Sequence, residues 1–103
     1  MALRIRLTDQ GAAPVIICDF CGEQIENSSD GNYEWNGEEY RNGMLHEVFF
    51  VHKENCSRLH ERRHGKVLDS MELDVLLPFM AANLGVEWDR ALKHAAYVAE
   101  PIG

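Results

Sequence analysis

The chain has 103 residues, a length typical of one domain whose hydrophobic core alone supplies limited stability. Hydrophobic residues make up 46% of it and charged residues 26%, which excludes a disordered or low-complexity chain. The formal net charge of −7 disfavours general affinity for nucleic acid, because phosphate binding needs a basic surface.

The N-terminal segments are predicted to form strands. Residues 3–7, LRIRL, alternate leucine or isoleucine with arginine, which is the period of a half-buried strand with a basic face suited to a sheet edge. Residues 14–18, PVIIC, are a short run rich in β-branched residues that enters the first cysteine. Residues 32–35, NYEW, and 45–52, LHEVFFVH, predict the two strands of a hairpin, because Asn-Gly turn signals lie between them at 36–37 and 42–43.

Helical patterns follow the hairpin. Residues 54–65, ENCSRLHERRHG, predict a short helix that begins with an Asn55 cap and ends at Gly65. Asp69 and Glu72 have the spacing of a capping box and predict the start of a second helix, which Pro78 should kink or divide. Its apolar stripe consists of Leu73, Leu76, Leu77, Met80 and Leu84. A last helix has a similar stripe of Trp88, Ala91, Leu92, Ala95 and Ala99 before Pro101. We expect both stripes to belong to the core.

No export or membrane signal is evident. The N-terminus lacks a continuous apolar run, and the longest uncharged run, 75–86, is too short to span a bilayer. We therefore expect a cytoplasmic protein without a membrane partner. Its three cysteines are an odd number, which argues against a disulfide framework and favours reduced thiols that bind a metal.

Two cysteines are placed as in a metal knuckle. Residues 18–22, CDFCG, follow a predicted strand, and Gly22 permits the left-handed turn that directs backbone N–H groups toward the sulfurs. A redox pair of the thioredoxin type would instead open a helix. Cys18 and Cys21 thus supply half of a tetrahedral zinc site, and Cys56 is the expected third ligand.

The fourth ligand has two candidates. His52 and His60 each lie four residues from Cys56, on opposite sides. We favour His52, because it ends a predicted strand next to the helix whose first turn holds Cys56. We expect one structural Zn²⁺ per chain, although spacing alone does not separate zinc from iron at a site of three cysteines and one histidine.

Together these segments resemble a treble-clef zinc finger, in which a knuckle supplies two ligands and the start of a helix supplies two more. The resemblance covers about residues 15–65, and it makes Cys18, Cys21, His52 and Cys56 the ligands. The last pair departs from the family, where Cys-x-x-Cys is commoner than His-x-x-x-Cys. The chain is also similar to small uncharacterised bacterial proteins that have a zinc knuckle and a helical tail.

The expected fold is an α+β single domain over 1–103, with a zinc-finger part at 15–66 and a helical part at 69–100. Its expected function is a non-catalytic protein-interaction module that binds a protein partner or a second copy of itself. Four ligands leave no open metal position, so we do not expect an enzyme, although His46 lies where nucleases built on a similar finger carry a histidine.

The alternative function is a DNA-binding regulator. Residues 79–95 partly resemble a helix-turn-helix, with Ala81 and Gly85 at the expected spacing, but the second helix opens with two acidic residues. Charge is split along the chain. The acidic hairpin surface is predicted at Glu34, Glu38 and Glu39. Partner contacts are predicted at Arg58, Arg62 and Lys66.

Overall fold

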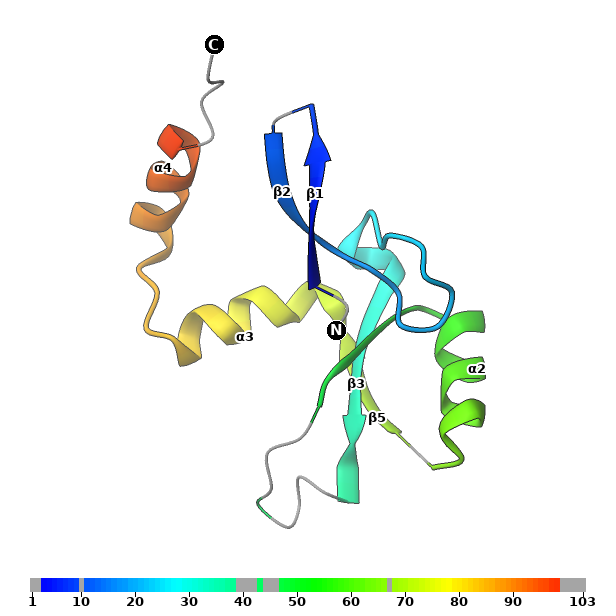
Figure 1. Cartoon of the computed structure of the whole chain (residues 1–103). Helices are drawn as coiled ribbons and strands as arrows, with labels where there is room; N and C mark the ends of the chain where they lie inside the picture. The colour runs from blue at the N-terminus through cyan, green and yellow to red at the C-terminus, as the bar shows by residue number, and fades with distance from the viewer. Residues whose placement is uncertain (1–2, 10, 39–42, 44–46, 67, 99–103) are drawn as a thin grey trace.

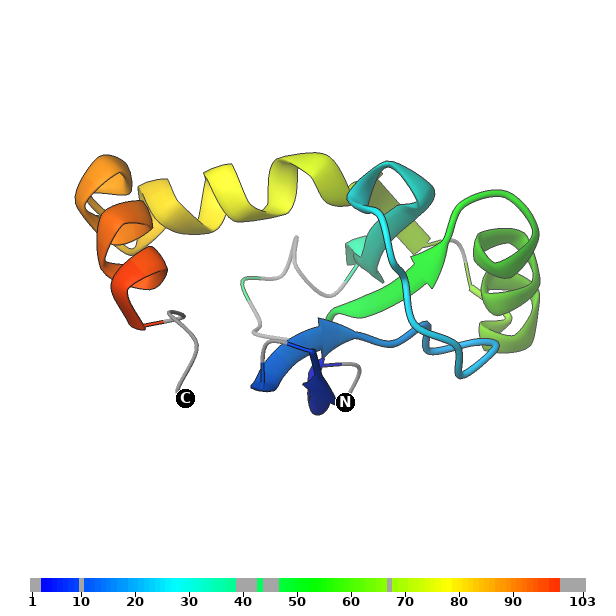
Figure 2. The same cartoon turned by 90° about the horizontal axis from the view of Figure 1, so that it is seen from above.

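The computed structural model describes residues 3–9, 11–38, 43, 47–66 and 68–98 (Figure 1). Two small antiparallel sheets and three α-helices make up its main elements. The predicted α+β class is confirmed. The molecule is elongated, with extents of 49 × 29 × 20 Å, and α2 and α4 lie at opposite ends of it in both views (Figures 1 and 2).

The first sheet is a hairpin of β1 (Leu3–Thr8) and β2 (Gly11–Ile16), paired antiparallel from Leu3 opposite Ile16 to Thr8 opposite Gly11. The strand predicted at 3–7 therefore exists. Its predicted buried face is wrong, because every residue of β1 is exposed and Leu7 is 83% exposed. The reason is that, within the described chain, β1 pairs only with β2 and no layer covers its apolar side.

The second sheet has the order β4-β3-β5, with both pairs antiparallel. Strands β3 (Gly31–Asn36) and β4 (Phe49–His52) form the predicted pair. Of the predicted strand at 45–52, residues 47 and 48 are not in β4, and 45 and 46 lie outside the described residues, as does Asn42 of the second turn signal.

Strand β5 (Leu68–Glu72) corrects the prediction that a helix starts at Asp69. Its backbone pairs with β3, where Asp69 lies opposite Trp35, and Leu68 is buried. Pairing with a distant strand outweighs the local capping pattern, since β3 offers a free edge to hydrogen-bond and an apolar layer for Leu68.

Helix α2 (Asn55–His64) ends at Gly65, which has a left-handed φ of 70° and donates its N–H to Glu61 and Arg62 carbonyls, as predicted. Its start differs from prediction, because Glu54 is the capping residue and Asn55 is already helical. Glu54 has a φ of 64°, a strained value for a residue with a side chain. The short helix η1 (Ser28–Asp30) precedes β3.

After β5 the chain forms the short helix η2 (Leu73–Val75), then α3 (Leu76–Asn83) and α4 (Trp88–Val98). Pro78 lies in the first turn of α3, where a missing N–H breaks no intrahelical bond, so it does not kink the helix interior. Among the described residues, none of these helices has both the length and the apolar character needed to cross a bilayer.

We call residues 76–98 the helical arm. It leads away from the sheets (Figures 1 and 2). Among the described residues, the expectation that its apolar stripes form core is wrong beyond Leu73 and the half-buried Leu76, because Leu77 is 62% and Leu92 is 54% exposed. Ala99 of the second stripe lies outside the described residues. Every residue of α4 is exposed in this single chain.

The buried core lies instead where the turn at Cys18 and the segment after it meet β4 and η2. Its members are Cys18, Ile25, Val51 and Leu73. Gly31 permits the close packing, since a Cβ there would come within 2.9 Å of the Leu73 side chain. A core of this size makes each member important.

Val51 offers a test of this core. It is 0% exposed, so Val51→Ala should lower the free energy of unfolding by about 2 kcal/mol, through lost burial and the cavity left behind. The matched control Val48→Ala, at a site that is 42% exposed, should change it by less than about 0.5 kcal/mol. Urea denaturation of the metal-loaded protein measures both, and equal effects would contradict the assigned core.

Candidate metal centre

Four side chains with metal-binding atoms converge where the first turn, strand β4 and helix α2 meet. They are Cys18, Cys21, His52 and Cys56, and their ligand atoms all lie within 4.8 Å of one another. The structure thus brings together all four residues of the predicted ligand set, from segments more than thirty residues apart in sequence.

The first two cysteines lie in a tight turn after β2. The N–H groups of Phe20 and Cys21 point at the Cys18 sulfur, at 3.4 and 3.5 Å, and Gly22 donates its N–H to the Cys18 carbonyl. Gly22 has the left-handed φ, 78°, that this turn requires. Backbone donors directed at a sulfur stabilise its thiolate form, which is the form that binds metal.

A hydrogen bond from Nε2 orients the ring of His52. His52 Nε2 lies 3.3 Å from the carbonyl oxygen of Gln24, so Nε2 carries the proton and donates it. The lone pair of Nδ1 then faces the Cys21 sulfur at 3.4 Å. A histidine that binds a metal through one nitrogen and donates from the other to a carbonyl has this arrangement.

Cys56 is the second residue of α2, where the positive end of the helix dipole favours a thiolate. The two-residue turn at Lys53 and Glu54 leads from His52 into this helix. The strained φ of Glu54 occurs in this turn, so the backbone stores strain at the point where β4 and α2 bring their two ligands together.

The electrostatics of the three thiols favour a bound cation. Burial opposes ionisation of Cys18, but hydrogen bonds from the backbone of Cys21 and His52 outweigh it and lower its pKa to about 7. Burial, together with the neighbouring Cys18 sulfur, raises the pKa of Cys56 to about 12. Cys18 and Cys56 therefore ionise together at neutral pH only when a metal ion compensates their charge.

The donor set suits a tetrahedral metal ion such as zinc. Zinc binds sulfur at about 2.3 Å and imidazole nitrogen at about 2.0 Å, so tetrahedral geometry separates an S and an N ligand by about 3.5 Å. The 3.4 Å between Cys21 and His52 agrees with this separation. These four residues could hold one metal ion as a closed site.

His60, the second candidate for the nitrogen ligand, lies outside this cluster. It is buried, and its Nδ1 lies 3.2 Å from a carboxylate oxygen of Glu34. The hydroxyl of Ser57 donates to the other oxygen of the same carboxylate. The prediction that Glu34 belongs to an acidic surface is therefore wrong, because it is 2% exposed and anchors α2 to β3. The sequence around Glu34 does not indicate that its side chain is buried, because the residues that bind it belong to α2.

The predicted partner contacts lie on and just after α2. Arg58 and Arg62 are exposed on the helix, and Lys66 is exposed beyond Gly65. Arg58 donates a hydrogen bond to the Asn55 side chain at 2.8 Å. Glu38 is exposed, whereas Glu39 and His46 lie outside the described residues.

Comparisons of the chain with protein-family models, with curated proteins and with solved structures find no match. The geometry of the four residues themselves is therefore what supports a metal site.

Removal of the metal tests the site as a whole. We expect one zinc per chain after purification without added metal, and a chelator should unfold at least the finger, since metal binding contributes on the order of 10 kcal/mol in small zinc modules. Cys18→Ser, Cys21→Ser and Cys56→Ser should each lose the metal. Elemental analysis and circular dichroism measure both effects, and a native spectrum at zero metal would contradict a structural role.

Substitution of each histidine tests which of the two binds the metal. His52→Ala should lose the metal, because it removes the fourth donor. His60→Ala should keep one zinc per chain and lose about 2 kcal/mol of stability, because it leaves a buried carboxylate with one partner fewer. The reverse pattern of metal contents would exclude His52 as the ligand.

Proposed function

We propose that this protein is a non-catalytic interaction module whose fold is held by one structural zinc ion. The observation that carries the proposal is the convergence of three thiols and one imidazole within 4.8 Å. Four N and S donors complete a tetrahedral shell and leave no position for water or substrate, unlike a catalytic zinc site.

The order of elements supports the treble-clef resemblance. The turn of Cys18 to Gly22, the β3–β4 pair and helix α2 follow one another as in such a finger, and His52 and Cys56 flank the start of the helix. Strand β5 adds a third strand to the sheet, and the helical arm follows it.

The apolar surface supports an interaction role. The arm exposes large hydrophobic side chains along both of its helices, and β1 exposes more. Monomeric proteins rarely leave so many apolar side chains together in water, so such a surface marks an interaction site. The large exposed residues of the arm are Leu77, Phe79, Met80, Leu84, Val86, Trp88, Leu92, Tyr97 and Val98.

DNA binding is less well supported. Helices α3 and α4 are joined by a turn at Gly85, in keeping with the partial helix-turn-helix resemblance. Glu87 and Asp89, however, place negative charge at the start of α4, where DNA-reading helices approach phosphates. The net charge of −7 also works against steering toward DNA.

A titration separates the two functions. Random-sequence duplex DNA at near-physiological salt should bind the zinc-loaded protein with a dissociation constant weaker than about 10 µM. Fluorescence anisotropy of labelled duplex measures this, with the triple variant of Arg58, Arg62 and Lys66 to alanine as control. Sub-micromolar binding that this variant abolishes would replace the interaction-module function by the DNA-binding one.

A further inference from the structure

We propose that the helical arm and the groove beside β2 form a symmetric dimer interface with a second copy of this chain. This proposal deepens the interaction-module function by naming the partner, and it rests on that function only in treating the exposed apolar surface as a binding surface. Its evidence comes from the arm and the first hairpin, not from the metal centre.

The single chain exposes more surface than is expected for a compact folded monomer of its mass. The chain has a mass of 11.7 kDa and exposes 7990 Å². A folded monomer of that mass exposes about 5,900 Å². The excess of about 2,000 Å² per chain lies within the range that each chain contributes to an obligate dimer, about 1,000–2,500 Å².

The radius of gyration, like the surface area, is larger than expected for a compact domain. The radius of gyration is 15.7 Å, whereas a compact domain of this length has about 13 Å. Helix α4 lies at the far end of the molecule from α2, in agreement with this extended shape (Figure 2). A second chain packed against the arm would restore a compact particle.

Helix α4 also requires a cover for its own stability. Each of its eleven residues is exposed, and it packs closely against no described strand or helix. Isolated helices of that length are marginal in water, because most helix stability in proteins comes from packing of an apolar face. Trp88 and Leu92, one turn apart, begin such a face.

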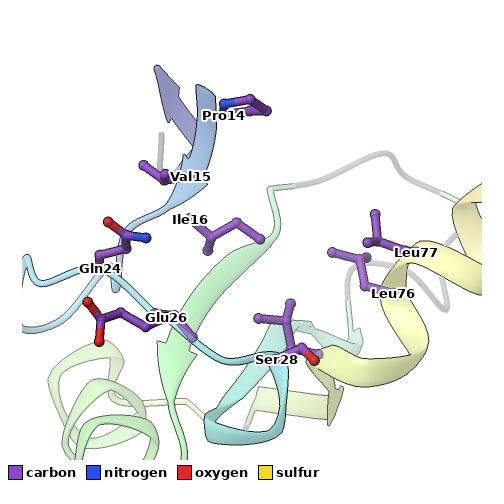
Figure 3. Close-up of a pocket in the computed structure, with 10 residues that line it drawn as sticks. Pro14, Val15, Ile16, Gln24, Glu26, Ser28, Leu76 and Leu77 are labelled. Carbon is purple, nitrogen blue, oxygen red and sulfur yellow. The ribbon is translucent and has the colours of Figure 1, made fainter. Parts of the chain in front are cut away.

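The same chain offers a receptor for an apolar helix. A groove of about 260 Å³ lies between the first hairpin and the start of the arm (Figure 3). Its apolar wall is formed by Pro14 and Ile16 on one side and by Leu76 and Leu77 on the other. Gln24, Glu26 and Ser28 also line the groove, so an apolar helix face matches its apolar walls and leaves a polar part beside them.

The turn between the helices keeps α4 out of its own groove. Gly85 has a left-handed φ of 67°, and the N–H of Val86 donates to the Ala81 carbonyl at 2.8 Å. These contacts fix the direction in which α4 leaves α3. One chain therefore carries both an uncovered apolar helix and an open apolar groove. In a two-fold symmetric dimer, α4 of each chain would lie in the groove of the other chain, so both helices and both grooves would be covered.

The experiment uses the full zinc-loaded chain. Light scattering coupled to size exclusion, at about 1 to 100 µM protein, should give twice the 11.7 kDa chain mass throughout. Zinc content is measured on the same fractions. A zinc-loaded monomer would overturn the dimer and leave the metal function standing, whereas a dimer without zinc would do the opposite.

Two double variants locate the interface. Leu77→Gln with Leu92→Gln should raise the dimer dissociation constant at least about 100-fold, because two large apolar side chains lose their burial. The matched control Arg90→Gln with Lys93→Gln changes the polar side of α4 and should leave the dimer intact. A dimer that survives the leucine changes, or one that the control dissociates, would overturn the assigned interface.

Hydrogen exchange on the unmodified protein gives an independent result should the leucine variant fail to fold. In the dimer the backbone amides of α4 should exchange at least about 100-fold more slowly than in an unstructured peptide. Exchange at the unprotected rate would show that nothing covers α4, and it would overturn the proposal.

Discussion

Asp19 and Phe50 hold the two halves of the metal centre together through the protein alone. The Asp19 N–H donates to the Phe50 carbonyl at 2.7 Å, and the Phe50 N–H donates to the Asp19 carboxylate at 2.8 Å. These paired bonds attach the turn that carries Cys18 and Cys21 to strand β4, which ends in His52. Cys18 is at the same time a core residue, 1% exposed and packed with Val51. The candidate metal centre and the core therefore depend on the same contact between turn and strand.

Helix α2 is attached to the rest of the fold by two kinds of contact. At its start, Cys56 belongs to the metal centre, and on its buried side Ser57 and His60 bind the carboxylate of Glu34. The carboxylate is buried in the middle strand of the sheet, where an unpaired charge would be costly. The strain at Glu54 is tolerated because both attachments fix the direction of the helix immediately after it.

Sequence reasoning succeeded where residue type and spacing carry the chemistry. Two cysteines before Gly22 specify a knuckle turn, and Gly65 specifies a helix end, because each needs a local backbone geometry. Strand β5 was missed because its partner β3 lies more than thirty residues earlier, whereas the capping pattern at Asp69 is local. Glu34 was misplaced for a related reason, since its partners come from α2. The apolar stripes of the arm predict that a face is covered, but periodicity alone does not say by which chain.

The chain passes directly from β5 through η2 into α3, with no loop residue between them. Leu73 joins the sheet and the arm, because it follows β5 at once and is buried beside Gly31. One residue inserted between Glu72 and Leu76 would turn α3 by about 100° about its axis, since each helical residue advances by that angle. The side to which Leu77 points is thus set by strand register rather than by the helix itself. Leu73 is held by core packing. At the other positions of this junction, length is under a tighter constraint than residue identity, so point substitutions there should be tolerated more readily than insertions or deletions.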